Sequence, residues 1–136
     1  MLVSFGERRT ETQNLLIKAA IDRRVRDPYT GKPLNNPQIE HVKPRCTFKP
    51  GQGKHYLGNL LVVQLDKRGC ERYDTWLRKN SDVPDYLQKY LDDMRGVVIK
   101  GVDYVKAAVK VLNREAAGIV RFHGNHRVKK KGAIHD

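Results

Sequence analysis

An apolar run of strand length over residues 59–65, Asn-Leu-Leu-Val-Val-Gln-Leu, most restricts the folds open to this chain. A short apolar run that contains β-branched residues is typical of a buried strand. Residues 38–43 form a second, shorter strand candidate, and a loop with Gly, Lys and Pro over 44–58 separates the two. Since two short strands joined by one loop can pair antiparallel, the sequence predicts a two-stranded hairpin.

Helical patterns flank this hairpin on both sides. The first has two alternative starts, because Thr10 with Gln13 and Ser4 with Glu7 both fit a capping box. Residues 119–136 form a basic tail that allows a short strand near 119–123. The segments with apolar residues at helical spacing are 7–26, 66–79, a stretch from Asp82-Val83-Pro84-Asp85 to Gly96, and 101–117 with Gly118 as C-cap.

The charge balance favours a polyanionic partner. Lys and Arg number 27 against 15 Asp and Glu, which gives a formal net charge of +12. Neutralisation of phosphates with release of their counterions favours binding by such a chain. The alternative is a basic protein whose charge serves solubility alone.

The cysteines and the apolar segments suggest a location. Cys46 and Cys70 form no CxxC pair, which predicts no zinc ribbon and favours free thiols in a reducing cytoplasm. A disulfide between them is the alternative. The sequence has neither an apolar stretch of membrane-spanning length nor the pattern of a signal peptide, so we expect a cytoplasmic protein without membrane contact.

Three segments carry a recognisable motif: Tyr29-Thr30-Gly31, then Ile39-Glu40-His41-Val42-Lys43-Pro44, then Gly58-Asn59-Leu60-Leu61-Val62-Val63. Their order and spacing resemble the motif of HNH endonucleases, whose ββα-metal core is an antiparallel hairpin followed by a helix. The resemblance covers roughly residues 14–78. It is to the branch without a zinc ribbon, which includes the HNH domains of CRISPR RNA-guided nucleases and small phage and mobile-element enzymes.

The resemblance implies an α+β fold, a ββα-metal core surrounded by additional helices, in one domain over residues 1–136. It also implies a divalent cation, Mg²⁺ or Mn²⁺, and no structural zinc. The expected parts are a core of about 27–79, an N-terminal helix over 7–26, a C-terminal helical extension over 82–118 and the basic tail over 119–136.

His41 is the strongest catalytic candidate, because a neutral imidazole near pH 7 can accept a proton from water. The resemblance implies that Glu40 helps to hold a cation, which stabilises charge at the scissile phosphate. Neighbours on an extended strand point to opposite faces, so joint action requires a bend at the strand end. The alternative is a surface Glu beside a partly buried His.

The resemblance gives Asn59 the role of bracing the loop and orienting His41, which an amide can do because it both donates and accepts. The alternative is an Asn that ends a turn after Gly58. The third position of the motif, usually His or Asn, falls near Asp66, the nearest hard-oxygen ligand. Lys67 or Arg68 occupies that position in an alternative alignment, and Asp66 also suits a helix N-cap.

A basic rim is expected around the scissile phosphate. The cations of the rim are Lys43, Arg45, Lys49, Lys54, Lys67, Arg68 and Arg72.

The predicted function is a metal-dependent endonuclease that hydrolyses DNA phosphodiester bonds, with His41 as general base. The alternatives are a catalytically decayed module that binds nucleic acid and a nuclease domain of a larger RNA-guided or restriction effector.

Overall fold

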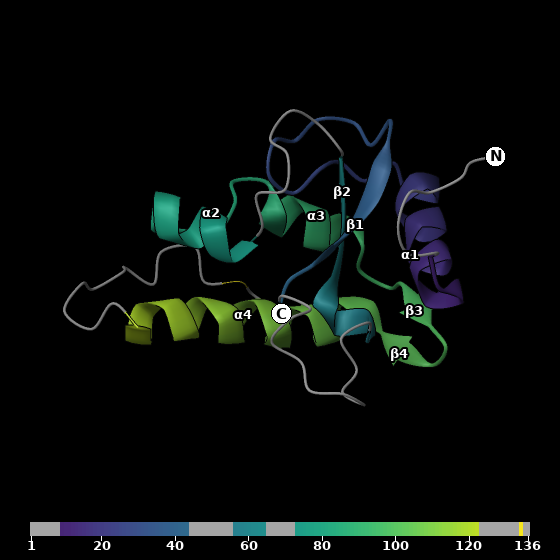
Figure 1. Ribbon diagram of the computed structural model, residues 1–136. Helices are drawn as coiled ribbons and strands as arrows, with labels where there is room; N and C mark the ends of the chain where they lie inside the picture. The colour runs from purple at the N-terminus through teal and green to yellow at the C-terminus, as the bar shows by residue number, and fades with distance from the viewer. Residues whose placement is uncertain (1–8, 44–55, 65–72, 123–133, 135–136) are drawn as a thin grey trace.

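The computed structural model describes residues 9–43, 56–64, 73–122 and 134, and within them the chain has an α+β fold (Figure 1). The predicted hairpin is present, and further helices surround it. The elements in chain order are α1 (Glu11–Asp22), β1 (Pro37–His41), the 3₁₀ turn η2 (Leu57–Asn59), β2 (Leu60–Gln64), α2 (Tyr73–Asn80), α3 (Leu87–Asp93), β3 (Val98–Ile99), β4 (Val102–Asp103) and α4 (Tyr104–Phe122).

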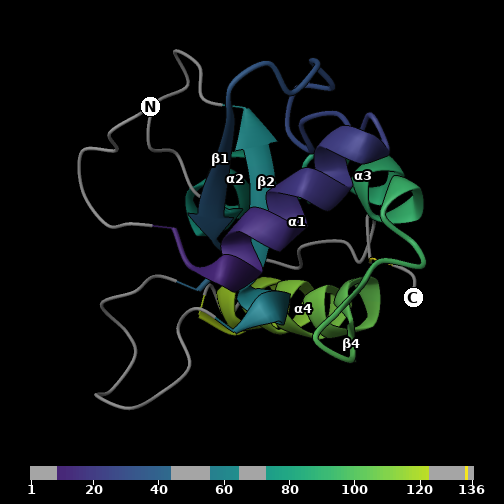
Figure 2. The same ribbon diagram turned by 90° about the vertical axis from the view of Figure 1, so that its right-hand side faces the viewer.

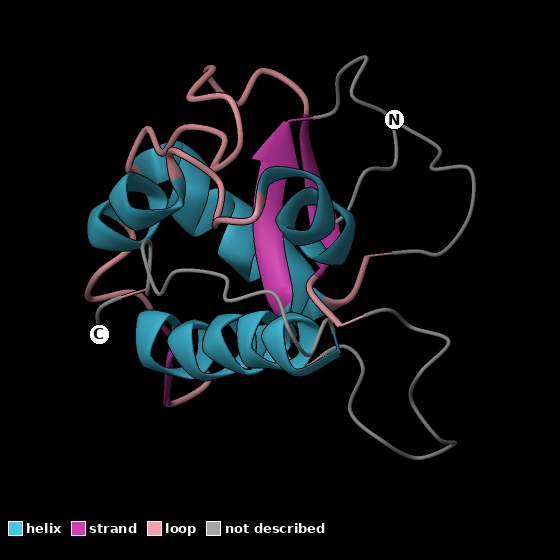
Figure 3. Ribbon diagram, turned by 90° about the vertical axis from the view of Figure 1, so that its left-hand side faces the viewer, coloured by secondary structure: helices cyan, strands magenta, loops and turns pink. Residues whose placement is uncertain are grey.

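Strands β1 and β2 pair antiparallel, from Pro37 opposite Gln64 to His41 opposite Leu60, which confirms the predicted pairing. All the apolar residues of β2 are buried, as expected for a strand covered on both faces. Helix α1 covers one face, and α2 lies on the other (Figure 2). The longer α4 crosses the end of the hairpin that carries His41, as the view from the side of α2 also shows (Figure 3).

The outer edge of β2 is closed by tyrosine hydroxyls instead of a third strand. The backbone groups of Leu60 and Val62 point away from β1, because alternate residues of an antiparallel pair face their partner. The Tyr104 hydroxyl donates to the Leu60 carbonyl at 2.6 Å, and the Val62 amide donates to the Tyr90 hydroxyl at 2.9 Å. Since the Tyr104 proton is already used, Tyr90 donates to Tyr104 across 2.8 Å.

Burial keeps both of these hydroxyls protonated. It raises the pKa of Tyr90 to about 12 and the pKa of Tyr104 well above its usual value. The buried edge of β2 therefore has donors and an acceptor that do not titrate near neutral pH.

Helix α1 begins later than predicted. Thr10 is its N-cap, and its hydroxyl accepts from the Gln13 amide while the Gln13 side chain accepts from the Thr10 amide. The Thr10–Gln13 capping box is therefore formed, and the alternative of Ser4 with Glu7 lies outside the described residues. The helix ends at Asp22 rather than residue 26, because Arg24 adopts a positive φ of 54° that breaks the helical path.

The structure tests the predicted middle helices only in part. Helix α2 covers the second half of the predicted 66–79 segment, and residues 65–72 lie outside the described ranges. Helix α3 begins at Leu87 rather than near Asp82, and Gly96 follows its end with a φ of +90°. The β3–β4 hairpin was not predicted. Its turn residues Lys100 and Gly101 both have positive φ, as two-residue hairpin turns often do.

Helix α4 corrects the prediction for the end of the chain. It continues through Gly118 to Phe122, so Gly118 is not a C-cap and residues 119–122 are neither strand nor tail. Ile119 is buried in the core and extends the apolar stripe of the helix by one turn. The free energy gained by burying the Ile119 side chain exceeds the cost of about 1 kcal/mol for placing Gly118 inside a helix.

The predicted C-terminal extension packs directly against the hairpin. Helix α4 contacts η2 closely at Gly58, where a Cβ atom would lie 2.7 Å from the Ala107 carbonyl oxygen. Only glycine allows this approach. Within the described ranges, no helix combines the length and the apolar character that crossing a bilayer requires.

Candidate functional site

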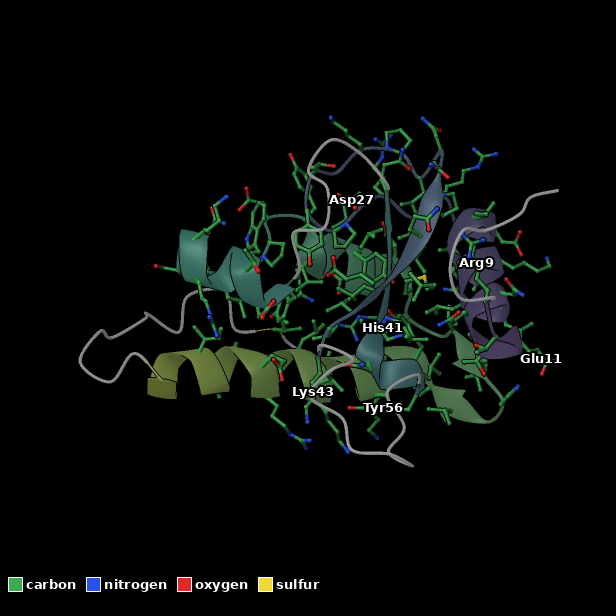
Figure 4. The ribbon with its side chains drawn as sticks, in the orientation of Figure 1. Arg9, Glu11, Asp27, His41, Lys43 and Tyr56 are labelled. Carbon is green, nitrogen blue, oxygen red and sulfur yellow. The ribbon has the colours of Figure 1, made fainter. Side chains whose placement is uncertain are left out.

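His41, Lys43 and Tyr56 lie at the end of the hairpin nearest α4, whereas Asp27 lies at the far end (Figure 4). His41 is the last residue of β1 and is partly buried, and Tyr56 precedes η2 with 42% of its surface exposed. The fold thus places the predicted base at a strand end beside a turn. This is the position that the motif requires.

Asn59 clamps the chain just after His41. Its buried side-chain Oδ1 accepts from the Lys43 amide at 2.8 Å, and its Nδ2 donates to the Lys43 carbonyl at 3.3 Å. The Asn59 carbonyl also accepts from the Val42 amide at 2.8 Å, which extends the β ladder by one pair. Both ends of the amide thereby fix the backbone two residues beyond His41.

Glu40 points away from His41. The Tyr29 hydroxyl donates to the Glu40 carboxylate, and the buried Tyr29 ring packs edge-on against Trp76 of α2, with ring centroids 5.3 Å apart. Glu40 therefore faces α2. The ladder stays regular here, with Glu40 opposite Leu61 and His41 on the opposite face. The chain bends at Val42 and Lys43, just after His41, so the bend comes too late to bring Glu40 and His41 to one face.

The predicted metal ligands are only partly within the described residues. Asp66 lies outside them, and the described residues contain no group of three or more His, Cys, Asp or Glu that would hold a metal ion. Glu40 is the one predicted ligand within the described residues, and its carboxylate accepts from Tyr29 on the face of β1 opposite His41.

Lys43 belongs to the basic rim and lies next to α4. Burial raises the pKa of Glu115 on α4, and the nearby positive charge of Lys43 opposes this rise. Both side chains are partly buried. The other predicted rim cations lie outside the described residues: Arg45, Lys49, Lys54, Lys67, Arg68 and Arg72.

Asp27 is a buried residue that organises the turn before β1. Its buried Oδ2 accepts from the Tyr29 amide at 3.2 Å, the Thr30 amide at 2.8 Å and the Thr30 hydroxyl at 2.9 Å. Its Oδ1 accepts from the Gln64 amide at 2.9 Å and so closes the far end of β2. The signal in the sequence was an Asp before Pro, which often bonds to the backbone that follows it.

A hollow of about 260 Å³ lies where α4 meets the segment after α3. Arg95, Gly96, Asp103, Val105 and Lys106 line it, and none of the predicted site residues does. It is therefore separate from the site around His41.

Comparisons with protein-family models, with curated proteins and with solved structures find no match for this chain.

Proposed function

We propose that this protein is a metal-dependent endonuclease of the HNH type, acting on DNA, with His41 as general base. The observation that carries the proposal is the clamp of Asn59 on the Lys43 backbone, at the end of an antiparallel hairpin that also bears His41. The excess of cations over anions in the chain adds support, because the substrate is a polyanion.

In this mechanism His41 takes the proton of the attacking water. Asn59 fixes the backbone at Lys43, two residues beyond His41. A divalent cation, Mg²⁺ or Mn²⁺, stabilises the charge that develops on the scissile phosphate when it is bound. Glu40 and Asp66 would hold this cation as carboxylate ligands. Lys43 contacts the phosphate backbone and helps to hold it at the site.

A plasmid-nicking assay tests the proposal, with purified protein in Mg²⁺, Mn²⁺ and EDTA. Wild type should nick the plasmid in either metal and not in EDTA. His41→Ala should lose at least about a hundredfold in rate, the usual contribution of a general base, and keep its affinity for DNA. Lys18→Ala serves as control, because Lys18 is exposed on α1 and paired with Asp22. Nicking by His41→Ala at the wild-type rate would disprove the role of His41.

A second candidate is a decayed HNH module that binds nucleic acid without cutting it. The orientation of Glu40 favours it, since this carboxylate bonds to Tyr29 and lies on the face opposite His41. This candidate predicts binding that weakens steeply with salt and no turnover in either metal. Nicking in Mg²⁺ or Mn²⁺ by wild type, absent in His41→Ala, excludes it.

A further inference from the structure

One face of α4 carries an exposed row of cations. Lys106, Lys110 and Arg114 follow one another at intervals of four residues, so they lie along one side of the helix over about 12 Å. All three side chains are exposed. We call them the α4 row.

The α4 row differs from three exposed lysines elsewhere in the protein, which have carboxylate partners. Lys18 pairs with Asp22 at 3.0 Å, Lys89 with Asp93 at 3.1 Å, and Lys100 with Glu11 at 2.8 Å. By contrast, the sequence of α4 contains a single acidic residue, Glu115, which is partly buried beside Lys43. Asp103 lies beside Lys106 just before the helix, and Glu115 lies near Arg114 as well as Lys43, so the three cations of the row exceed the carboxylates next to them by one.

The α4 row borders the hairpin end that carries His41. Gly58 of η2 packs against Ala107, and Lys110 and Arg114 follow Ala107 by three and seven residues, the spacing of one helix side. Farther along the helix, Lys43 lies close to Glu115. Figure 4 shows Lys43 and Tyr56 beside α4 at this end of the molecule. Lys110 and Arg114 are thus the part of the row next to the proposed site, and Lys106 lies at the hollow lined by Arg95 and Gly96.

We infer that the α4 row binds the phosphate backbone of the nucleic acid and holds it against the hairpin end. This inference rests on the proposed function for the identity of the partner. One strand of a duplex carries a phosphate about every 3.4 Å along the axis, so a row of about 12 Å matches three or four of them. Contacts of this kind position the substrate without reading its sequence. The C-terminal helix then serves as part of the substrate-binding surface as well as of the core.

The experiment measures binding rather than cleavage. Lys106→Gln, Lys110→Gln and Arg114→Gln are combined in a His41→Ala background, and binding to a short fluorescent DNA duplex is followed in EDTA. Affinity is measured between about 50 and 200 mM salt, where phosphate contacts dominate its change. Each lost contact should lower the slope of log affinity against log salt by about one, so the triple variant should lower it by about three.

A matched control removes the same charge elsewhere. Lys18→Gln, Lys89→Gln and Lys100→Gln are combined in the same background, so both triple variants lose three formal charges. The control should keep the slope of the parent protein. Equal slopes for the two triple variants, with or without a change from the parent, would overturn the inference. Thermal melting of both variants checks that each is folded.

The outcome is separable from that of the nuclease assay. A lower slope for the α4 variant supports the inference even if the wild type cuts nothing in any metal. Metal-dependent nicking by wild type, with an unchanged slope for the α4 variant, overturns the inference and leaves the endonuclease in place.

Discussion

The two ends of the β1–β2 hairpin are fastened in the same way but present different surfaces. At the far end Asp27 accepts from the Gln64 amide, and at the near end Asn59 bonds to the Lys43 backbone. Asp27 is fully buried among its donors, whereas His41 and Lys43 are partly exposed at the near end and the α4 row is exposed along the neighbouring helix.

This difference separates structure from function. A carboxylate whose oxygens accept from buried backbone amides stabilises the fold and has few acceptor positions left with which to bind a ligand. A neutral amide can brace the backbone while the neighbouring imidazole and ammonium groups meet solvent. Substitutions at the far end should therefore reduce stability, and substitutions at the near end should reduce activity or binding more than stability.

The largest expected effect is at the far end, for Asp27→Ala. The amides of Tyr29, Thr30 and Gln64 lose their acceptor, and the free energy of unfolding should fall by at least about 3 kcal/mol, since each unpaired buried donor costs about 1–3 kcal/mol. Urea denaturation measures it. Asp22→Ala, at an exposed residue of α1, is the control and should change stability by less than about 0.5 kcal/mol. Equal losses in the two variants would contradict the structural role of Asp27.

A smaller effect on stability is expected at the near end, for Asn59→Ala. The part-buried amide and carbonyl of Lys43 lose their partners, at a cost of about 1–3 kcal/mol. Nicking should fall further than the loss of folded protein explains, because His41 is no longer held in place. Asn80→Ala is the control, since its side chain makes an exposed bond to the Trp76 carbonyl. Normal nicking by folded Asn59→Ala would show that the clamp serves stability alone.

Local sequence patterns predicted the hairpin, its antiparallel pairing and the Thr10 capping box, because each depends on a few neighbouring residues. They failed where contacts between residues far apart in the sequence determine the local structure. Helix α4 passes Gly118 because Ile119 finds a place in the core. The tyrosine hydroxyls that close the edge of β2 come from helices about 28 and 44 residues farther along the chain, and no local pattern reveals such a bond.

The candidate site was predictable to a similar degree. The motif placed His41 at a strand end, where it lies, and Asn59 at the start of the second strand, whereas Asn59 ends η2 one residue before β2. The direction of Glu40 was not predictable, because it depends on the Tyr29 hydroxyl and on a ladder that stays regular to His41. The exposed face of α4 was not predicted as a binding surface, because the sequence pattern of this segment indicated only a helix with apolar residues at helical spacing. Its position beside η2 emerges from the tertiary structure.

The smallest expected effect is a dependence of stability on pH near the α4 row. Burial raises the pKa of Glu115, and Asp74 adds to this, while Lys43 and Arg114 oppose it. As pH rises above about 4.3, the usual pKa of a Glu carboxyl, Glu115 keeps its proton to higher pH in the folded chain than in the unfolded chain, so stability falls. Glu115→Gln removes this loss. The variant should match wild type below about pH 4 and be more stable near neutral pH, by less than about 1 kcal/mol at a partly exposed site.

Glu11→Gln provides a control of opposite sign. The hydrogen bond and charge of Lys100 lower the pKa of Glu11, so its contribution is present above the usual value and is lost as pH falls through the lowered one. Unfolding in urea across the acid to neutral range should therefore show Glu115→Gln gaining and Glu11→Gln losing stability relative to wild type as pH rises. A shift of both variants in the same direction would mean that total charge, rather than the burial of Glu115 beside Lys43, sets the pH dependence.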